Sequence, residues 1–404
     1  MEAWNLSRHL IDDSMEEFMR WSLLAAISVS PLVMFSFAGL GGAQTPEGIR
    51  VSGPVVHENL AVYFIHGKSA PGKVPLTLEE AMAKGLVKVR ETGNVNQLEI
   101  ENLGKEEVFV QSGDIVKGGQ QDRTLMVSLV LPPQSGSIPI ASFCVEQGRW
   151  SARGREDVKS FSTASAAVPS REMKIAMKAP LPTPPAAAEP NPTQAPADVG
   201  AIDSRLRHAR IPSPRTAYAV ASAGAAETSQ RQQQVWDNVR KTQAKLAERV
   251  GAPVRSAQSA SSLQLALESE KLVDAQKGYV KALKAAGESG DDIIGYVFAI
   301  SGELNSADVY TSNGLFRKMW AKLLSASAIE AIGHRDDPRA TAPTIEAVTA
   351  FLAAAEAGKS SEKPLNAGVR LETREGEKAY FFETARAASP SAPAAWVHRN
   401  YLAK

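Results

Sequence analysis

Hydrophobic and polar residues alternate along much of the first half of the chain. From about Val51 to Trp150, short apolar runs and strict alternation are separated by turns rich in Gly, Pro and Asn, which is typical of β-strands. Thr77 and Glu80 have the spacing of a capping box, which predicts one short helix ending near Gly85. The expected strands cover residues 60–65, 87–90, 97–101, 107–111, 125–131 and 138–145.

Tight turns connect several of these strands. Residues 102–105 and 132–136 are turn sequences, so sequential strands are expected to pair antiparallel, as a small sandwich or a barrel-like sheet.

Helical spacing dominates the chain after about residue 227. Apolar residues recur on one face of four expected helices, at residues 235–250, 265–283, 313–329 and 344–357. Strands are expected at 293–300, at 309–310 after a turn through Asn305, and at 369–373, 378–383 and 395–398. Since these strands could complete a sheet with the earlier ones, the pattern predicts an α+β fold.

A Ser-, Ala- and Pro-rich tract separates the two halves. It is densest at 179–196, cannot bury a core, and predicts a disordered insert at residues 163–226. A flexible loop whose ends lie close costs little closure entropy per added residue. We therefore expect residues 50–162 and 227–404 to fold as two parts of one interrupted domain.

The N-terminal segment has the order of a secretory signal peptide. A charged lead ends at Arg20, the apolar run 21–38 follows, and small residues lead to a predicted cleavage after Ala43. The mature chain would begin at Gln44 and be periplasmic or secreted. An uncleaved membrane anchor formed by 21–38 is the alternative, because that run is close to the minimum length for spanning a bilayer.

Charge and cysteine content exclude several classes of function. The chain has 45 Lys and Arg against 44 Asp and Glu, so it lacks the basic excess of a nucleic-acid-binding protein. A single cysteine allows no intramolecular disulfide and no multi-thiolate zinc site. The histidines have no ligand-like spacing, so neither a metal nor a cofactor is expected.

Polar side chains concentrate in two segments at the ends of predicted strands. The first is Gly118–Arg123, where two glycines allow a sharp turn beside Gln120, Gln121, Asp122 and Arg123. It matches no nucleotide-binding fingerprint. These groups suit a small polar ligand, with Arg123 placed for a phosphate or carboxylate, while a turn held by a structural Arg–Asp pair is the alternative.

The second polar segment is Cys144–Trp150. Cys144 and Glu146 are two residues apart, which would place them on one face of a strand. A thiolate nucleophile needs a neighbouring cation that the sequence does not place, so a small core residue is the favoured interpretation of Cys144. Glu146, Gln147 and Arg149 are better candidates for a polar binding site, with a structural salt bridge as the alternative.

Three positions in the second half complete the candidates. Trp236 and Trp320 lie on apolar faces of expected helices, which indicates core packing. Asp308 lies between a turn and a strand, where capping or turn formation is favoured over a catalytic role.

These motifs together resemble a known family. The segments 118–123, 132–133, 144–150 and 233–236, with Asp308 ahead of Trp320, are similar to the bacterial ARPP-1 domain, named for its association with ADP-ribosylglycohydrolase and rhodanese-phosphatase superfamily proteins. The resemblance covers about residues 50–335 and implies kinship rather than a reaction. The long insert departs from the family pattern. The polar positions that the resemblance implies are Gln120, Asp122, Arg123, Glu146, Gln147 and Arg149.

Three functions are consistent with the sequence. The first is a module that binds a small polar or phosphorylated ligand through both polar segments. The second is a hydrolase with Glu146 or Asp122 as general acid or base and an arginine stabilising negative charge, so whether the chain is an enzyme stays open. The third is a structural or cell-envelope interaction protein whose protein partner the sequence does not identify.

Overall fold

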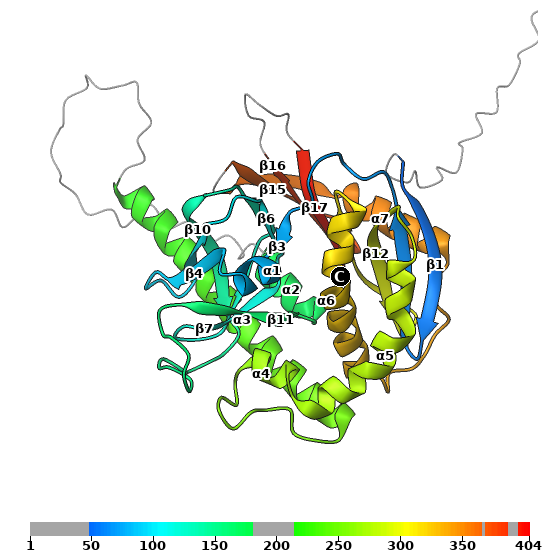
Figure 1. Cartoon of the computed structure of the whole chain (residues 1–404), viewed down its shortest axis with the longest axis horizontal. Coiled ribbons are helices and arrows are strands. Elements are labelled where there is room, and N and C mark those ends of the chain that lie inside the picture. Colours follow the sequence, from blue (N-terminus) through cyan, green and yellow to red (C-terminus); the bar gives the residue numbers. More distant parts are fainter. Residues whose placement is uncertain (1–47, 181–213, 366–367, 387–394) are drawn as a thin grey trace, which may run out of the picture. The chain divides into compact units, whose positions relative to one another are not determined.

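Antiparallel pairing links the two ends of the described chain in one sheet. The computed structural model describes residues 48–180, 214–365, 368–386 and 395–404. Eight antiparallel strands form the larger sheet in the order β1-β2-β12-β13-β17-β16-β15-β14 (Figure 1). They are β1 (Arg50–His57), β2 (Leu60–His66), β12 (Ile293–Ile300), β13 (Glu303–Tyr310), β14 (Lys359–Pro364), β15 (Val369–Glu375), β16 (Ala379–Arg386) and β17 (Ala395–Ala403).

Strand β12 is central because it is apolar along its whole length and buried on both faces. Phe298 packs into the core cluster shared with the long helices, whereas Val297 packs into a cluster on the opposite face. Neighbouring side chains on a strand point to opposite faces, so a continuous apolar run belongs between two covering layers. Helices cover both faces of this sheet.

The first half forms a smaller, curled sheet. Its order is β11-β7-β8-β10-β5-β4, and a bridge between Arg90 and Ser160 brings the two outer strands together at one end. The predicted barrel-like antiparallel sheet is therefore confirmed. Its strands are β4 (Val87–Glu91), β5 (Gln97–Asn102), β7 (Asp114–Gly118), β8 (Arg123–Leu125), β10 (Gly136–Cys144) and β11 (Phe161–Ala167).

A third, three-stranded sheet adds one parallel pair. Strands β3 (Leu76–Thr77) and β6 (Val108–Val110) run parallel, and β9 (Leu129–Leu131) pairs antiparallel with β6. The predicted capping box is confirmed, because the Thr77 and Glu80 side chains each bond the backbone of the other at the start of α1 (Leu78–Ala83).

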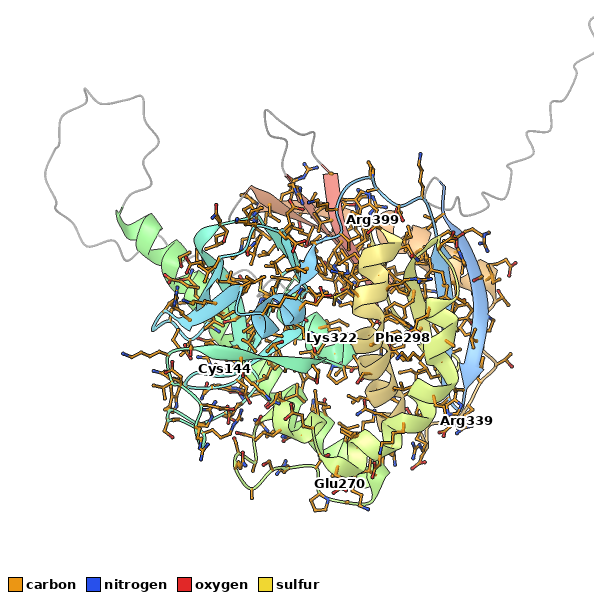
Figure 2. The ribbon with its side chains drawn as sticks, in the orientation of Figure 1. Cys144, Glu270, Phe298, Lys322, Arg339 and Arg399 are labelled. Atoms are coloured by element: carbon orange, nitrogen blue, oxygen red, sulfur yellow. The ribbon has the colours of Figure 1, made fainter. Side chains whose placement is uncertain are left out.

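Helix α6 (Asn313–Gly333) joins the two halves. It packs against α5 (Glu270–Glu288), α3 (Pro214–Val250), β12 and β11. Trp320 is 1 % exposed and meets the rings of Phe64 and Tyr296, so its predicted core role is confirmed. Figure 2 shows side chains filling the space between these elements. The remaining helices are α2 (Arg171–Lys178), α4 (Leu263–Leu267) and α7 (Ile345–Glu356).

Three element predictions were wrong in detail. The single strand expected at 125–131 is two strands in different sheets, because Ser128 between them is buried against His398. Asn305 lies inside β13, and the turn comes earlier, where Ser301 and Gly302 have positive φ. The helix expected at 265–283 is divided into α4 and α5, because Ser262 and Ser269 each begin a helix as N-cap.

The start of the expected insert belongs to the fold. Strand β11 and helix α2 lie within residues 161–178, since Met173, Ala176 and Met177 bury one face of a helix capped by Ser170. Helix α3 also begins earlier than expected, at Pro214. The rest of the insert, 181–213, and the signal segment lie outside the described residues. Among the helices that the structure describes, none is both long and apolar enough to cross a bilayer.

Candidate functional site

The two polar segments meet beside the β7–β8 turn. Gly118 and Gly119 both have positive φ, at 111° and 54°, a conformation that glycine adopts without steric cost. A Cβ atom at Gly119 would collide with the ring of Phe161. The paired glycines therefore allow the turn to lie directly against β11, where Glu146 and Arg149 approach it from the loop after β10.

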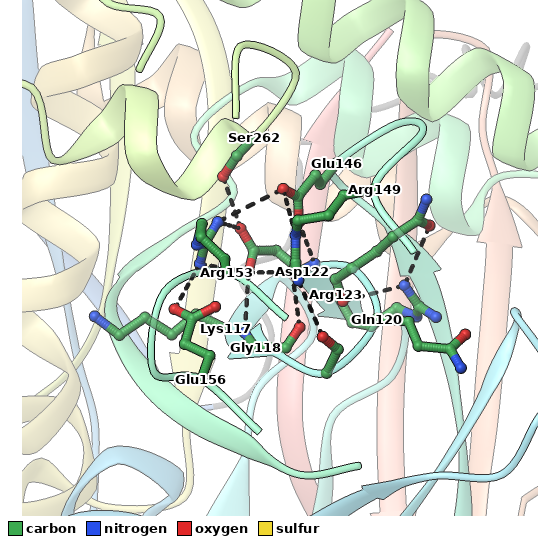
Figure 3. A network of polar contacts seen from close by, with 12 residues as sticks. Lys117, Gly118, Gln120, Asp122, Arg123, Glu146, Arg149, Arg153, Glu156 and Ser262 are labelled. Atoms are coloured by element: carbon green, nitrogen blue, oxygen red, sulfur yellow. Dashed lines mark hydrogen bonds and ion pairs between the residues drawn. The ribbon is translucent and has the colours of Figure 1, made fainter. Parts of the chain in front are cut away.

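Asp122 is the centre of the resulting network (Figure 3). Arg153 donates to both carboxylate oxygens, at 2.9 and 3.0 Å. The Gly118 amide donates to Oδ1 at 3.0 Å, and the Ser262 hydroxyl donates to Oδ2 at 2.7 Å. Asp122 is 0 % exposed, so this buried charge is balanced by a bidentate guanidinium and two neutral donors.

Glu146 closes the network from the other segment. Its Oε2 accepts the Asp122 amide at 2.9 Å and its Oε1 accepts Arg149 Nε at 2.7 Å. Burial alone would raise the pKa of Glu146, but hydrogen bonds from Arg149, Ser259 and the Asp122 amide bring it below its ordinary value. Glu146 is therefore an anion that holds the loop after β10 against the turn.

Arg149 and Arg153 complete the connections. Arg149 donates to the carbonyl oxygens of Gly118 and Gly119, each at 3.0 Å, and Arg153 also donates to Glu156 at 2.8 Å. Every carboxylate oxygen of Asp122 and Glu146 already accepts a donor from within the chain. The geometry is that of a set of internal links between two loops.

Arg123 lies outside this network. It is 0 % exposed, donates to the Gln121 carbonyl at 3.1 Å and pairs with Glu91 at 3.3 Å. Gln120 lies beside it, half-buried, with its amide donating to Glu91 at 3.0 Å. Within the described residues, two buried donors here, Arg123 Nε and Gln121 Nε2, have no acceptor.

The structure thus brings together three of the predicted site residues, Asp122, Glu146 and Arg149, and places Arg123 and Gln121 in a neighbouring group. Arg153 and Glu91 were missed. Arg153 follows the recognisable motif in a loop without periodicity, and Glu91 reaches the group only through the sheet closure, so neither gave a local signal.

Cys144 is a buried core residue. It ends β10, so Glu146 lies beyond the strand rather than on the same strand face. Burial raises the pKa of the Cys144 thiol to about 11. The interpretation of Cys144 as a small core residue agrees with this burial, because a protonated thiol is a poor nucleophile.

The Gln147 side chain makes no hydrogen bond to the Asp122 network within the described residues, and it lines a pocket of about 140 Å³. Its backbone is clamped by Ser261, whose hydroxyl donates to the Gln147 carbonyl at 2.6 Å and accepts the Gln147 amide at 3.1 Å. Trp236 forms part of the wall and is half-buried, so its predicted packing role was only partly right. Two guanidinium groups, those of Arg240 and Arg255, complete the opening.

Three donors in this pocket are incompletely used. The buried Trp236 Nε1–H has no acceptor, and Arg255 makes no hydrogen bond or ion pair, among the residues that the structure describes. Arg240 pairs with Asp237 and donates to Gln147 Oε1 at 3.2 Å, and its side chain remains about half exposed. The pocket can therefore offer an indole donor and two cations to one anionic group.

Comparison with known protein families decides the relationship. The pattern described as the ARG and Rhodanese-Phosphatase-superfamily-associated Protein domain matches residues 48–402. The chain belongs to the ARPP-1 family. The ARPP-1 match extends beyond residue 335, where the resemblance based on the motifs ended. The added residues include β15, β16 and β17, which belong to the same sheet as β1 and β2. A comparison with curated proteins and one with solved structures each gave no match.

Proposed function

We propose that this ARPP-1 domain binds a small anionic ligand, carrying a phosphate or carboxylate, in the pocket formed by Gln147, Trp236, Arg240 and Arg255. The observation that carries the proposal is the buried Trp236 N–H without an acceptor, in a pocket that also presents two guanidinium groups. Burying a polar donor without a hydrogen bond costs free energy, and a ligand oxygen would remove that cost.

The pocket lies between two family motifs. Gln147 comes from the Cys144–Trp150 segment and Trp236 from the 233–236 segment of α3. The Asp122–Glu146–Arg149 network fixes the loop that carries Gln147, and Gln147 in turn accepts from Arg240. This arrangement gives the motif residues a role in positioning the pocket, without requiring each of them to touch the ligand.

The size and opening of the pocket favour one charged group with the rest of the ligand outside. About 140 Å³ is well below the volume of most sites that enclose a drug-sized molecule. A phosphate suits the planar donors of Arg240 and Arg255, which can form paired hydrogen bonds to its oxygens. Sugar phosphates and nucleotide sugars are therefore ligands of the right chemistry.

A hydrolase that uses Glu146 or Asp122 as its acid or base is less well supported. Both side chains are 0 % exposed, and their oxygens accept internal donors. A general acid or base must come within hydrogen-bond reach of a substrate proton. A purely structural or cell-envelope role would leave the pocket donors without a ligand.

The direct test is isothermal titration of the full chain with inorganic phosphate, pyrophosphate, ADP-ribose and glucose 6-phosphate. Arg255→Ala and Trp236→Phe should weaken binding of the same anion roughly tenfold each, since each loses one charge-assisted or neutral hydrogen bond. Arg155→Ala is the matched control, because Arg155 is an exposed arginine outside the pocket. No binding of any of these anions at millimolar concentration would contradict the proposal.

We also propose that the domain acts outside the cytoplasm. This rests on the sequence order of the N-terminal segment alone. Expression in a bacterium, with fractionation and N-terminal sequencing, should recover periplasmic or secreted protein beginning at Gln44. Protein that remains in the cytoplasm with residues 1–43 attached would contradict export, whereas membrane-bound, uncleaved protein would indicate an anchor.

A further inference from the structure

A series of polar contacts leads from the larger sheet to Lys178, in α2, which lies at a different cavity from the Trp236 pocket. Lys178 Nζ donates to Asn400 Oδ1 at 2.5 Å. Asn400 Nδ2 donates in turn to Asp308 Oδ1 at 2.9 Å and to the Ala307 carbonyl at 3.1 Å. Asn400 is thereby held with its carbonyl oxygen toward the amine.

The inner end of this series of contacts, at Asp308, is closed to solvent. His398 Nε2 lies 3.1 Å from Asp308 Oδ1, and His398 Nδ1 lies 3.0 Å from the Ser128 hydroxyl. Asp308, His398 and Ser128 are each 3 % exposed. A serine, a histidine and a carboxylate in sequence are the groups of a hydrolytic triad, but here all three side chains are buried. They fix the position of Asn400, and the prediction that Asp308 caps a turn was wrong because Asp308 lies inside β13.

The outer end of this series of contacts, at Lys178, lies at a large cavity. Lys178 lines a cavity of about 900 Å³ bounded by β10, β14, β15 and residues 225–231 of α3. The Lys178 Nζ atom lies over the Phe382 ring, 4.5 Å from its centre. The Asp308 carboxylate, which attracts the Lys178 ammonium, already lies against His398 and Asn400, and Lys178 has no ion-pair partner of its own within the described residues.

The cavity wall holds a second unused polar group. Ser142 is 1 % exposed and lines the cavity, and among the described residues its hydroxyl has no hydrogen-bond partner. Lys363, from β14, lines the same cavity and is exposed, and among the described residues its side chain makes no hydrogen bond or ion pair. A ligand that carries both a carbonyl and a carboxylate would supply an acceptor to the hydroxyl and an anion to Lys363.

Burial lowers the pKa of Lys178 to about 7, with Lys174 adding to the effect and Asp308 opposing it. The amine is then substantially neutral at physiological pH, which an ordinary lysine is not. The titratable and charged groups that the surrounding elements bring near it are Lys174 from α2, Asp308 from β13, His398 from β17, Glu227 and Arg231 from α3, and Glu362 and Lys363 from β14.

We propose that Lys178 is the nucleophile of a second site, where it forms an imine with a small carbonyl compound, preferentially a 2-oxo acid. The amine lone pair attacks the carbonyl carbon and forms the C–N bond while the carbonyl π electrons move to oxygen. Proton transfer from nitrogen to oxygen and loss of water then give the C=N bond, so no oxidant or reductant is consumed.

The test uses the full chain with glyoxylate as probe and cyanoborohydride to reduce the imine to a stable adduct. Peptide mapping by mass spectrometry should find Lys178 modified at pH 7 roughly tenfold or more faster than the lysines on the surface, because an ordinary lysine is almost wholly protonated at that pH. The rate at Lys178 should fall as pH decreases through about 7. Modification spread evenly over surface lysines, or a rate at Lys178 that rises only near pH 10, would overturn the proposal.

Two variants test separately the role of Lys178 as nucleophile and the role of Lys363 in binding the carboxylate of the 2-oxo acid. Lys178→Met should remove the fast adduct while leaving slow labelling of the other lysines. Lys363→Met, at an exposed position, should slow the reaction of Lys178 with glyoxylate severalfold and leave its reaction with propanal unchanged. An equal effect on both probes would overturn the 2-oxo acid preference. These outcomes concern a cavity separate from the Trp236 pocket. They therefore do not test the anion-binding proposal, which the isothermal titration tests independently.

Discussion

Replacement of Asp122 by alanine should destabilise the fold strongly. The substitution removes the carboxylate that accepts hydrogen bonds from two guanidinium nitrogens of Arg153 and from the Ser262 hydroxyl. The Arg153 side chain, which is only 5 % exposed, then keeps its positive charge with fewer negative groups beside it. Loss of one partner from a buried charge pair costs roughly 3–5 kcal/mol. Glu156 still pairs with Arg153, so the lower part of that range is expected.

Urea unfolding followed by circular dichroism measures this change. The midpoint should fall with an unchanged slope, since the surface exposed on unfolding is the same. Asp122→Asn keeps one oxygen acceptor and should lose less stability than Asp122→Ala. Asp291→Ala is the control, because Asp291 is exposed and outside the network, and exposed substitutions usually stay within about 0.5 kcal/mol. An Asp122→Ala variant as stable as Asp291→Ala would refute the structural interpretation of the network.

Three further predictions follow from named groups. Native Cys144 should resist iodoacetamide at pH 8 and react only on unfolding, because its pKa is raised to about 11 by burial. Gly119→Ala should destabilise by several kcal/mol through its collision with the Phe161 ring and its positive φ, as measured by thermal unfolding. The pKa of Glu146 is lowered in the folded state, so its contribution to stability is present above its ordinary pKa and lost as pH falls through the folded value. Glu146→Gln should therefore differ most from wild type in urea midpoint near pH 7, and the difference should shrink as the pH falls below the ordinary pKa of a glutamate.

Local rules predicted the elements whose signals are local. The Thr77 and Glu80 capping box begins a helix because two neighbouring groups satisfy each other, and no distant residue is needed. The apolar run of β12 predicts a buried strand for the same reason. Strand β14 gave no such signal, since all its residues are exposed and it exists by pairing with β15.

The candidate site shows the same division. Gly118–Arg123 and Cys144–Trp150 were recognisable as polar segments at strand ends, and the fold brings Asp122 to Glu146. The sequence did not predict that Arg153 would pair with the Asp122 carboxylate, because the two residues are 31 positions apart, with strands β8, β9 and β10 between them. It also did not predict the pocket, since Trp236 packs beside Gln147 only when α3 lies against the loop after β10.

The central claim is that an anion binds at the indole of Trp236, and indole ¹⁵N–¹H resonances report that contact directly. In protein labelled at the indole nitrogen, the Trp236 peak can be assigned by its absence in Trp236→Phe. Titration with pyrophosphate or ADP-ribose should move this peak in a saturable way, because the N–H gains an acceptor, while the buried Trp320 peak stays in place. A Trp236 peak that none of the tested phosphates moves would contradict the account.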